Sequence, residues 1–501
     1  MPQIGRRNLF SDTREVTKDN VIKILTDVQA DFQANRNDCQ RLLDIEAGYM
    51  PIARQKTSRP EIDVKTVDSI AHEIVEFKVG YHFGNTINFV SRGLKDSGNS
   101  DETAAIAILN EYYNAENIGR KQKAMGYYVE TTGIGYSYVN VKSDWKDGES
   151  LFEVETLDPR FAFVVRSSLY TDHRVILGVT FRQDKEGNTY YTAFTDKYRF
   201  DITNLNVVLT SRNLVGMIPI VEWERSTDRM GVFEREIPEM ERLNLILSDI
   251  GNDVESECNM IWHLNDCQLP MKKDADGNDT DEIDRPKSGE WIVTETTKDG
   301  KSPFIKPLIT NYDYAGLLNN YTSARALILE RTYTPQRNGN NGSSTGLAIQ
   351  SATGYESAEQ AACAQQLLIE SSKMDEVRVA LAVIKASTAR VPDEKLLALK
   401  PMDLKPNVTR TKLYEMTVKT TALANMLSHG IHGLHALRAV NFFEDVNAAW
   451  EDSKDLIEKY QNHAFGVNEE VKPSSVDPIN QITNSPLVDS IGKEAPVEET
   501  E

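Results

Sequence analysis

The feature of the sequence that most limits its fold is a pair of long helical patterns that enclose a short β pattern. The first runs from Pro238 to Trp262, and acidic residues crowd its first turn, where the helix dipole favours them. Its 25 residues would span roughly 37 Å at the α-helical rise. A second helix is predicted from Asn311 to Tyr333, with Asn311 or Asp313 as its N-cap. Because strand patterns lie between them, the two helices are expected to run out and back and to carry a small β module at their tip.

The rest of the chain mixes helical and strand patterns, which predicts an α+β fold. Apolar residues recur at helical spacing from about Lys18 to Gly84, and a period of two over about Tyr128 to Trp223 predicts a mostly antiparallel sheet. Residues 334–346, almost all polar or glycine, predict a loop. Helical patterns follow over 347–388, with a kink at Gly354, and over 410–462. The segment 466–501 is predicted to be disordered, because it holds too few apolar side chains to offset its ordering entropy.

Charge and composition restrict the class of protein. The 501 residues include 56 Lys and Arg against 76 Asp and Glu, a formal net charge of -20. Tight binding to duplex DNA requires clustered basic side chains that meet phosphates, so this balance excludes a general DNA-gripping surface. Four cysteines without a CxxC pair indicate a reducing compartment. The N-terminus lacks an apolar signal segment and no stretch reaches the ~18 apolar residues of a membrane span, so neither secretion nor membrane insertion is expected.

No motif in the sequence indicates an enzyme. Phosphate-binding loops of the G-x-x-x-x-G-K-[ST] type and G-x-S-x-G nucleophile turns are absent, so no catalytic residue, cofactor or metal is predicted. The spacing of His429, His432 and His435 would spread their side chains over about 240° of a helix, which does not suit one ion. Asp274 and Asp276 resemble the start of a calcium loop, but the later Gly and Glu are missing. Acidic residues are numerous enough to leave one enzymatic alternative, a cytoplasmic hydrolase with a carboxylate-bound Mg²⁺.

Four phrases of the sequence are recognisable. They are AGYMPIARQK (47–56), VGYHFGNTINF (79–89), MIPIVEWERSTDRMGVFE (217–234) followed by LNLILSDIGNDVE, and GSSTGLAIQSATGYESAEQAA (342–362). They resemble phrases of the portal proteins of long-tailed double-stranded-DNA phages that infect Gram-positive bacteria. Thr86 stands where that family commonly has Pro, and Ser226 and Thr227 stand where it has Asn, so these turns are expected to differ. The last two phrases flank the predicted helix, β module and helix, and the resemblance covers about residues 19–460.

The resemblance implies a portal fold with an α/β wing, a two-helix stem, a small α/β clip, a long kinked helix and an α-helical crown. By position, the parts are the N-terminal region and wing (1–230), first stem helix (231–265), clip (266–310), second stem helix (311–333), tunnel loop (334–346), long helix and wing return (347–404), crown (405–465) and acidic tail (466–501).

The resemblance also implies a virion protein that forms a ring of about twelve copies around a DNA channel at one capsid vertex. Such a ring conducts double-stranded DNA during packaging and ejection. Its implied partners are terminase, head-completion and adaptor proteins, the major capsid protein and the scaffolding protein, with assembly in the host cytoplasm. Another virion connector protein is the remaining structural alternative.

The resemblance gives a role to the two faces of the first long helix. Its apolar stripe is expected to pack between neighbouring subunits, and its polar stripe to line the channel: Asn244, Ser248, Asn252, Glu255 and Asn259. A neutral or acidic wall does not hold a duplex that carries a charge every ~1.7 Å, so DNA would slide. The tunnel loop is expected to touch phosphates transiently, with an ordinary surface linker as its alternative, and its residues are Gln336, Arg337, Asn338, Asn340 and Asn341. The clip residues expected to meet partners are Trp291, Lys298, Lys301 and Lys306.

Overall fold

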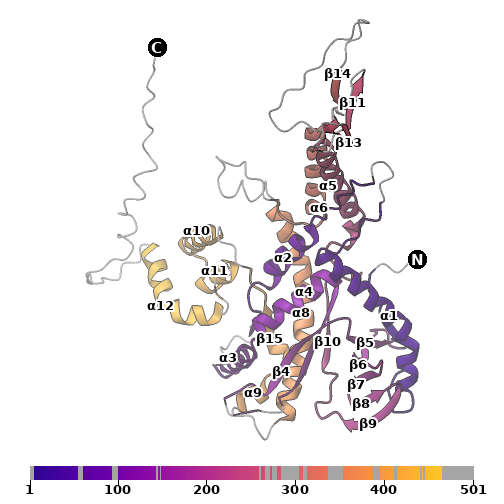
Figure 1. The fold of residues 1–501 in the computed structure, drawn as a ribbon. Helices are drawn as coiled ribbons and strands as arrows, with labels where there is room; N and C mark the ends of the chain where they lie inside the picture. Colours follow the sequence, from indigo (N-terminus) through magenta and orange to yellow (C-terminus); the bar gives the residue numbers. More distant parts are fainter. Residues whose placement is uncertain are drawn as a thin grey trace, which may run out of the picture. The chain divides into compact units, whose positions relative to one another are not determined.

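The computed structural model has an α+β fold, as predicted, and divides into two compact units, residues 1–412 and 413–501 (Figure 1). It describes residues 5–54, 60–92, 100–142, 145–146, 148–258, 261–265, 271–273, 279–283, 304–308, 313–336, 354–387, 394–410, 415–440, 443 and 446–464. The predicted tail at 466–501 lies outside these residues.

The larger sheet of the first unit has six strands, in the order β1 (Leu9–Ser11), β5 (Ala162–Ser167), β6 (Val175–Gln183), β7 (Thr189–Phe194), β8 (Tyr198–Thr203) and β9 (Asn206–Arg212). Neighbouring strands are antiparallel, except that β1 runs parallel to β5. Helix α1 (Val21–Glu46) covers one face, because its apolar stripe faces the sheet. Phe32 of this helix packs against Phe163, with the ring centroids 4.3 Å apart.

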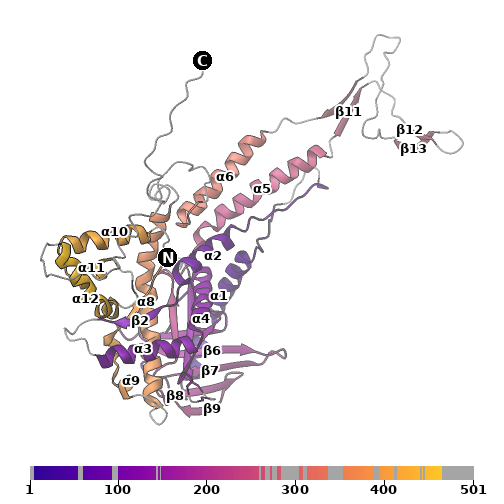
Figure 2. The same cartoon turned by 90° about the vertical axis from the view of Figure 1, so that its left-hand side faces the viewer.

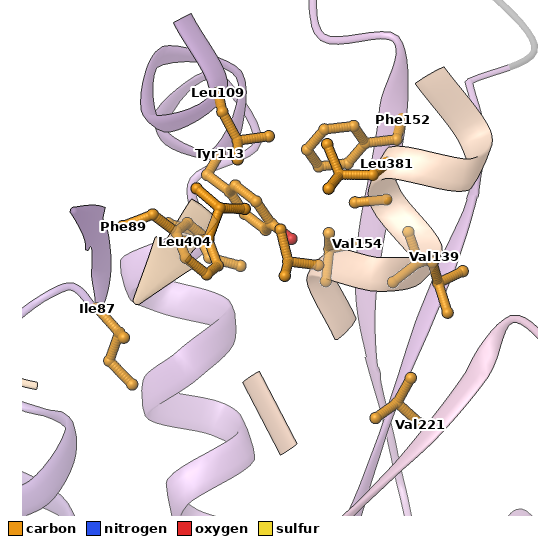
Figure 3. Close-up of a cluster of buried hydrophobic side chains, with 14 of the residues drawn as sticks. Ile87, Phe89, Leu109, Tyr113, Val139, Phe152, Val154, Val221, Leu381 and Leu404 are labelled. Atoms are coloured by element: carbon orange, nitrogen blue, oxygen red, sulfur yellow. The ribbon is translucent and has the colours of Figure 1, made fainter. Parts of the chain in front are cut away.

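A second sheet, of three strands, supports the main core. Its order is β10 (Ile220–Glu224), β3 (Ile134–Val141) and β4 (Phe152–Leu157), all antiparallel, with Trp223 opposite Gly135. Apolar side chains of this sheet pack against helices α8 (Tyr355–Ala386) and α3 (Ser100–Ala115) and against the strand pair β2 (Asn88–Ser91) and β15 (Leu404–Asn407). Figure 3 shows Tyr113 of α3 lying among Phe89, Phe152 and Leu404. This core therefore joins segments that are far apart in the sequence, together with helix α9 (Glu394–Ala398). The 3-10 turn η3 (Pro401–Asp403) leads into β15.

Helices α2 (Ile70–Phe83) and α4 (Ile118–Thr132) pack against each other in the same unit. Helix α4 ends at Gly133, which has a φ of 83° in the left-handed region that favours glycine. A Cβ there would lie 2.5 Å from the Arg229 carbonyl oxygen. The sheet predicted from Tyr128 therefore begins at Ile134, because residues 128–132 complete the last turn of α4.

The predicted helix, β module and helix are present (Figure 2). After the 3-10 turn η1 (Glu234–Glu236), α5 (Ile237–Cys258) packs along α6 (Tyr314–Arg331). Beyond them β11 (Ile261–Asn265) pairs with β14 (Phe304–Leu308), and β12 (Met271–Lys273) pairs with β13 (Asp279–Ile283). Helix α5 stops short of the predicted end at Trp262, because that residue belongs to a strand. The predicted cap of α6 is confirmed: the Asp313 side chain accepts a hydrogen bond from the Gly316 amide at 2.9 Å.

Gly354 begins the long helix α8 instead of kinking it. Its φ of 86° places it in the left-handed region at the N-cap, and the helix continues to Ala386. The predicted start at 347 lies outside the described residues.

The described residues of the second unit form three helices in the region where the sequence predicted helix: α10 (Glu415–Ser428), α11 (Gly433–Val440) and α12 (Val446–Ala464). Gly433 allows α11 and α12 to pack closely, because a Cβ there would lie 2.3 Å from the Trp450 ring. The three histidines of the sequence motif are exposed around the turn between α10 and α11. Within the described parts of the chain, no group of three His, Cys, Asp or Glu residues is placed to hold a metal ion.

Of the helices that the structure describes, none combines the length and the apolar character needed to cross a membrane.

Candidate functional site

The α5–α6 pair is the candidate site, because the resemblance places a DNA channel there. Its base is fixed in a shared apolar core: Leu243 of α5 and Ile328 of α6 are fully buried and pack with Ile74 of α2. Beyond the pair, β11 pairs with β14, and Figure 1 labels both strands. The base of the α5–α6 pair is therefore fixed in the body of the first unit.

An extended segment, residues 62–68, lies along α5 and is called the strap below. Every second backbone amide of the strap donates to every fourth side chain of the helix. The donors and acceptors are the Val64 amide to Asn252 Oδ1 (2.7 Å), the Thr66 amide to Ser248 Oγ (3.0 Å) and the Asp68 amide to Asn244 Oδ1 (2.9 Å). Two return bonds join the Ser248 hydroxyl to the Thr66 carbonyl and the Asn252 amide to the Val64 carbonyl. Side chains thus replace a second strand as the hydrogen-bonding partner of the strap.

We call this regular series of hydrogen bonds the ladder, and each bond from a strap amide to a side chain of α5 one rung. The spacing of residues along the two elements explains it. Four helical residues advance about 6.0 Å and two extended residues about 6.7 Å, so successive rungs stay nearly aligned. Gly251 allows the close approach, because a Cβ there would lie 3.1 Å from Val64 Cγ1. The exposed ion pair between Arg54 and Asp249 joins the same helix to the segment before the strap.

Helix α6 holds the other end of the strap. The Tyr321 hydroxyl donates to Asp68 Oδ2 at 2.8 Å, and Arg325 Nε donates to the same oxygen at 3.3 Å. Arg325 also forms an ion pair with Glu73 of α2. The strap is therefore bound by both helices of the pair.

The ladder changes the interpretation of the predicted channel-lining stripe. Asn244, Ser248 and Asn252 are only 1–2% exposed, because the strap covers them. They bind their own chain and present no open polar surface. Glu255 is half-buried, and a channel-lining role for it stays a prediction, whereas Asn259 lies outside the described residues.

The other predicted site residues are described only in part. Gln336 Nε2 donates to the Ala326 carbonyl at 3.1 Å, so the start of the predicted tunnel loop folds back on α6. Lys306 is exposed on β14, opposite His263, with its ammonium 5.2 Å from the Phe304 ring centroid. The remaining predicted residues lie outside the described parts of the chain: Arg337, Asn338, Asn340, Asn341, Trp291, Lys298 and Lys301.

A buried charge cluster, which the sequence analysis missed, lies near the root of that loop. Glu130 of α4 is completely buried and is approached by His82 of α2 (Nδ1 to Oε1, 2.8 Å), Gln365 of α8 (Nε2 to Oε1, 2.6 Å) and Arg225 after β10 (Nε to Oε2, 3.1 Å). Burial would raise the pKa of Glu130, but these cationic and hydrogen-bonding partners lower it to about 2. One carboxylate therefore joins four elements.

Lys78 connects this cluster to the end of α6. Its Nζ donates to the Tyr333 carbonyl at 3.0 Å, and Tyr333 has a φ of 52° in the left-handed region. Burial lowers the pKa of Lys78 to about 8, although the charge of Glu130 opposes this shift. The backbone turn that leads out of α6 is thus fixed by a buried ammonium group.

One sequence signal could have revealed the strap. Ile62, Val64 and Thr66 alternate with polar residues in a short run between two helices, which is typical of an extended segment with one covered face. No comparable local signal marks Glu130, because its partners come from three other parts of the chain: α2, α8 and the segment after β10.

A comparison with known families gives the class of protein. A sequence model described as "Phage portal protein, SPP1 Gp6-like" matches residues 63–463, which is 401 of the 501 residues. The match includes all of the strap but Ile62, the α5–α6 pair and most of α12. The chain therefore belongs to the phage portal protein family, whose members are structural proteins of the virion. Within that class, the family that matches is the SPP1 Gp6-like one. No curated protein matches the chain significantly.

The ladder predicts how the strap responds to loss of one rung. Replacing Asn252 with Ala removes the partner of the Val64 amide, and an unsatisfied buried donor costs about 1–3 kcal/mol. Local opening of the strap should then increase about tenfold, measured as the rate of trypsin cleavage after the exposed Lys65. Asn319→Ala, on an exposed face of α6, should leave that rate unchanged. Equal rates for Asn252→Ala and the wild-type protein would contradict the ladder.

The buried carboxylate predicts a pH dependence of stability. A glutamate with a folded-state pKa of about 2 and an ordinary value of 4.5 stabilises the fold fully above pH 4.5 and loses this contribution as the pH falls toward 2. Glu130→Gln should therefore lose about 3 kcal/mol at pH 7, and its deficit against wild type should shrink between pH 4.5 and 2. Urea unfolding at several pH values measures both quantities. The exposed variant Glu111→Gln is the control, and a Glu130→Gln deficit independent of pH would refute the charge assignment.

Proposed function

We propose that this chain is the subunit of a ring at one capsid vertex, and that double-stranded DNA passes through the centre of the ring during packaging and ejection. The observation that carries the proposal is the family match over residues 63–463, which includes the α5–α6 pair. The α5–α6 pair is proposed as the stem that surrounds the DNA. The β11–β14 module is proposed as the clip that meets terminase and the head-completion proteins, with Lys306 on its exposed surface.

The charge pattern of α6 supports a wall along which DNA slides. From Tyr314 to Ala324 the helix has no charged residue, and its exposed side chains there are Ala315, Leu318, Asn319, Asn320, Thr322 and Ser323. The next cation, Arg325, is held by Asp68 and Glu73. A surface without free cations makes no lasting bond to phosphate, so a duplex can move past it.

This pattern revises which face of the stem is proposed to meet DNA. The exposed face of α6 replaces the polar stripe of α5 that the sequence predicted, since three members of that stripe bind the strap. Glu255 is retained as a channel residue, because its carboxylate would repel phosphate. The segment 334–346 remains the proposed tunnel loop.

Electron microscopy tests the proposed assembly directly. The purified full-length chain should form rings with an axial hole in negative stain, because portal subunits close by a heterologous interface around a rotation axis. Particles of one or two subunits at all concentrations, without rings, would overturn the proposal. Metal-dependent hydrolysis by such particles would favour the enzymatic alternative.

New cations on α6 should hinder DNA movement. Asn319→Lys combined with Ser323→Lys places two cations one helical turn apart on the exposed face, where each can bind a phosphate. Rings should still form, but the DNA packaged in a fixed time should fall several-fold, with partial recovery at higher salt.

The matched control replaces the same two residues with Gln, which adds length without charge. It should package DNA at the wild-type rate, and normal packaging by the lysine variant would contradict the assignment of this face. The same assay on a deletion of residues 338–342 tests the tunnel loop, since removal of a mere linker should change neither the length nor the retention of packaged DNA.

A further inference from the structure

A groove of about 720 Å³ lies between α2 and α4, outside the proposed stem. Its floor and walls include Val79, Gly80 and Phe83 from α2 and Tyr128 from α4, and its rim carries Arg120 and Lys123. Figure 1 shows the two helices that form it. None of these side chains belongs to the strap or to the Glu130 cluster, so the groove is separate from both of these features.

Most of the glycines on these two helices are explained by contacts within the chain. A Cβ on Gly126 would lie 2.4 Å from the Phe83 ring, and a Cβ on Gly119 would lie 3.0 Å from Thr86 Oγ1. A Cβ on Gly84 would lie 2.2 Å from the Gly80 carbonyl oxygen. These three glycines therefore allow the helices to turn and to pack.

Gly80 is different, because no described residue fills the space beside it. A Cβ there would meet no atom of the described residues within 4 Å, and its φ is not in the left-handed region. Glycine inside a helix is less stable than alanine, because it loses more backbone freedom on folding. No contact among the described residues therefore requires glycine at this position. A requirement from outside the subunit, the close approach of another molecule to the backbone of α2, would explain it.

The residues around Gly80 are of types that are common in protein–protein interfaces. Tyr128 is half-buried and Arg120 is exposed, and Tyr and Arg are enriched among the residues that contribute most to binding. Arg120 and Lys123 stand at the rim with one acid, Glu76, which lies 3.6 Å from Lys123. The rim is thus locally basic on a chain whose net charge is -20.

We propose that this groove receives a surface of a second copy of the same chain in the assembled ring. Copies that each carry a charge of -20 repel one another, and a basic rim is where an acidic neighbour is attracted. The missing side chain at Gly80 then admits the neighbour's backbone or side chains to the floor of the groove. The inference rests on the proposed ring and adds one of the two surfaces of its heterologous interface.

Substitutions at Gly80 should affect the assembly of subunits without lowering the stability of the single subunit. A purely structural role of Gly80 would instead lower that stability. In the dissociated subunit, Gly80→Ala should unfold at the same temperature as wild type or higher, since the Cβ enters open space. The same variant, Gly80→Ala, should assemble into rings less readily than the wild-type chain. Gly80→Leu should raise the subunit concentration for half-assembly at least tenfold, measured by mass photometry of the full-length chain. Ala30→Leu, which adds the same bulk to an exposed position of α1, should assemble as wild type does.

A second variant protects the test against misfolding. Arg120→Glu reverses a charge on an exposed side chain and should raise the same concentration at least tenfold at low salt, with a smaller effect at high salt. Lys23→Glu, an exposed charge reversal on α1, is its control. If wild-type chains form rings and both groove variants form them at unchanged concentration, the groove proposal fails while the ring stands. If wild-type chains form no rings, the proposed function fails and takes the groove proposal with it.

Discussion

The buried carboxylate of Glu130 is the interaction on which the centre of the first unit depends. A charged group can remain fully buried only when its partners replace the water that it loses, and here the partners come from α2, α8 and the segment after β10. Each of these elements is thereby fixed relative to α4. The cost of burying the charge is offset only when all of them are in place, so the cluster specifies one arrangement of the core instead of several.

The α5–α6 pair, which we propose as the stem, is joined to this centre by polar contacts as well as by apolar packing. The strap binds both α5 and α6, and Lys78 binds the backbone at the end of α6 while lying close to the Glu130 cluster. A force on either helix is therefore transmitted to α2, which carries the strap at one end and Lys78 within it. If DNA moves past this pair as proposed, these contacts help the pair to hold its shape.

The sequence predicted local structure well and partner choice poorly, for a physical reason. Periodicity and capping depend on neighbours in the chain, so the helix, β module and helix and the Asp313 cap could be predicted. The same periodicity showed that Asn244, Ser248 and Asn252 share one face of α5, but it could not show what covers that face. A polar stripe facing water and a polar stripe facing a buried backbone have the same spacing. The cover comes from residues 62–68, roughly 180 residues earlier in the chain, and this distance hides it from local patterns.

The protein family could be predicted from the sequence, whereas two sites in the chain could not. Four phrases were enough to suggest the portal family, and the match over residues 63–463 confirms it. The Glu130 cluster and the groove beside Gly80 arise from tertiary contacts between helices that carry no motif for them. The sequence alone does not distinguish Gly80 from the other glycines of these helices. The distinction comes from the structure, in which a Cβ on Gly80 would meet no atom of the described residues within 4 Å.

The hydrogen bonds between the strap and α5 stay aligned only over a short distance, because the two elements differ in their rise per rung. Each rung advances about 0.7 Å further along the strap than along the helix, so the register drifts by about 1.4 Å across the three rungs. Over this length the position of each side chain on α5 fixes the position of the strap residue that it binds. Insertion of a single residue between Asn244 and Asn252 would rotate the next rung by about 100° away from the strap. The ladder therefore tolerates a change in the length of this part of α5 only where the change brings the next rung back to face the strap.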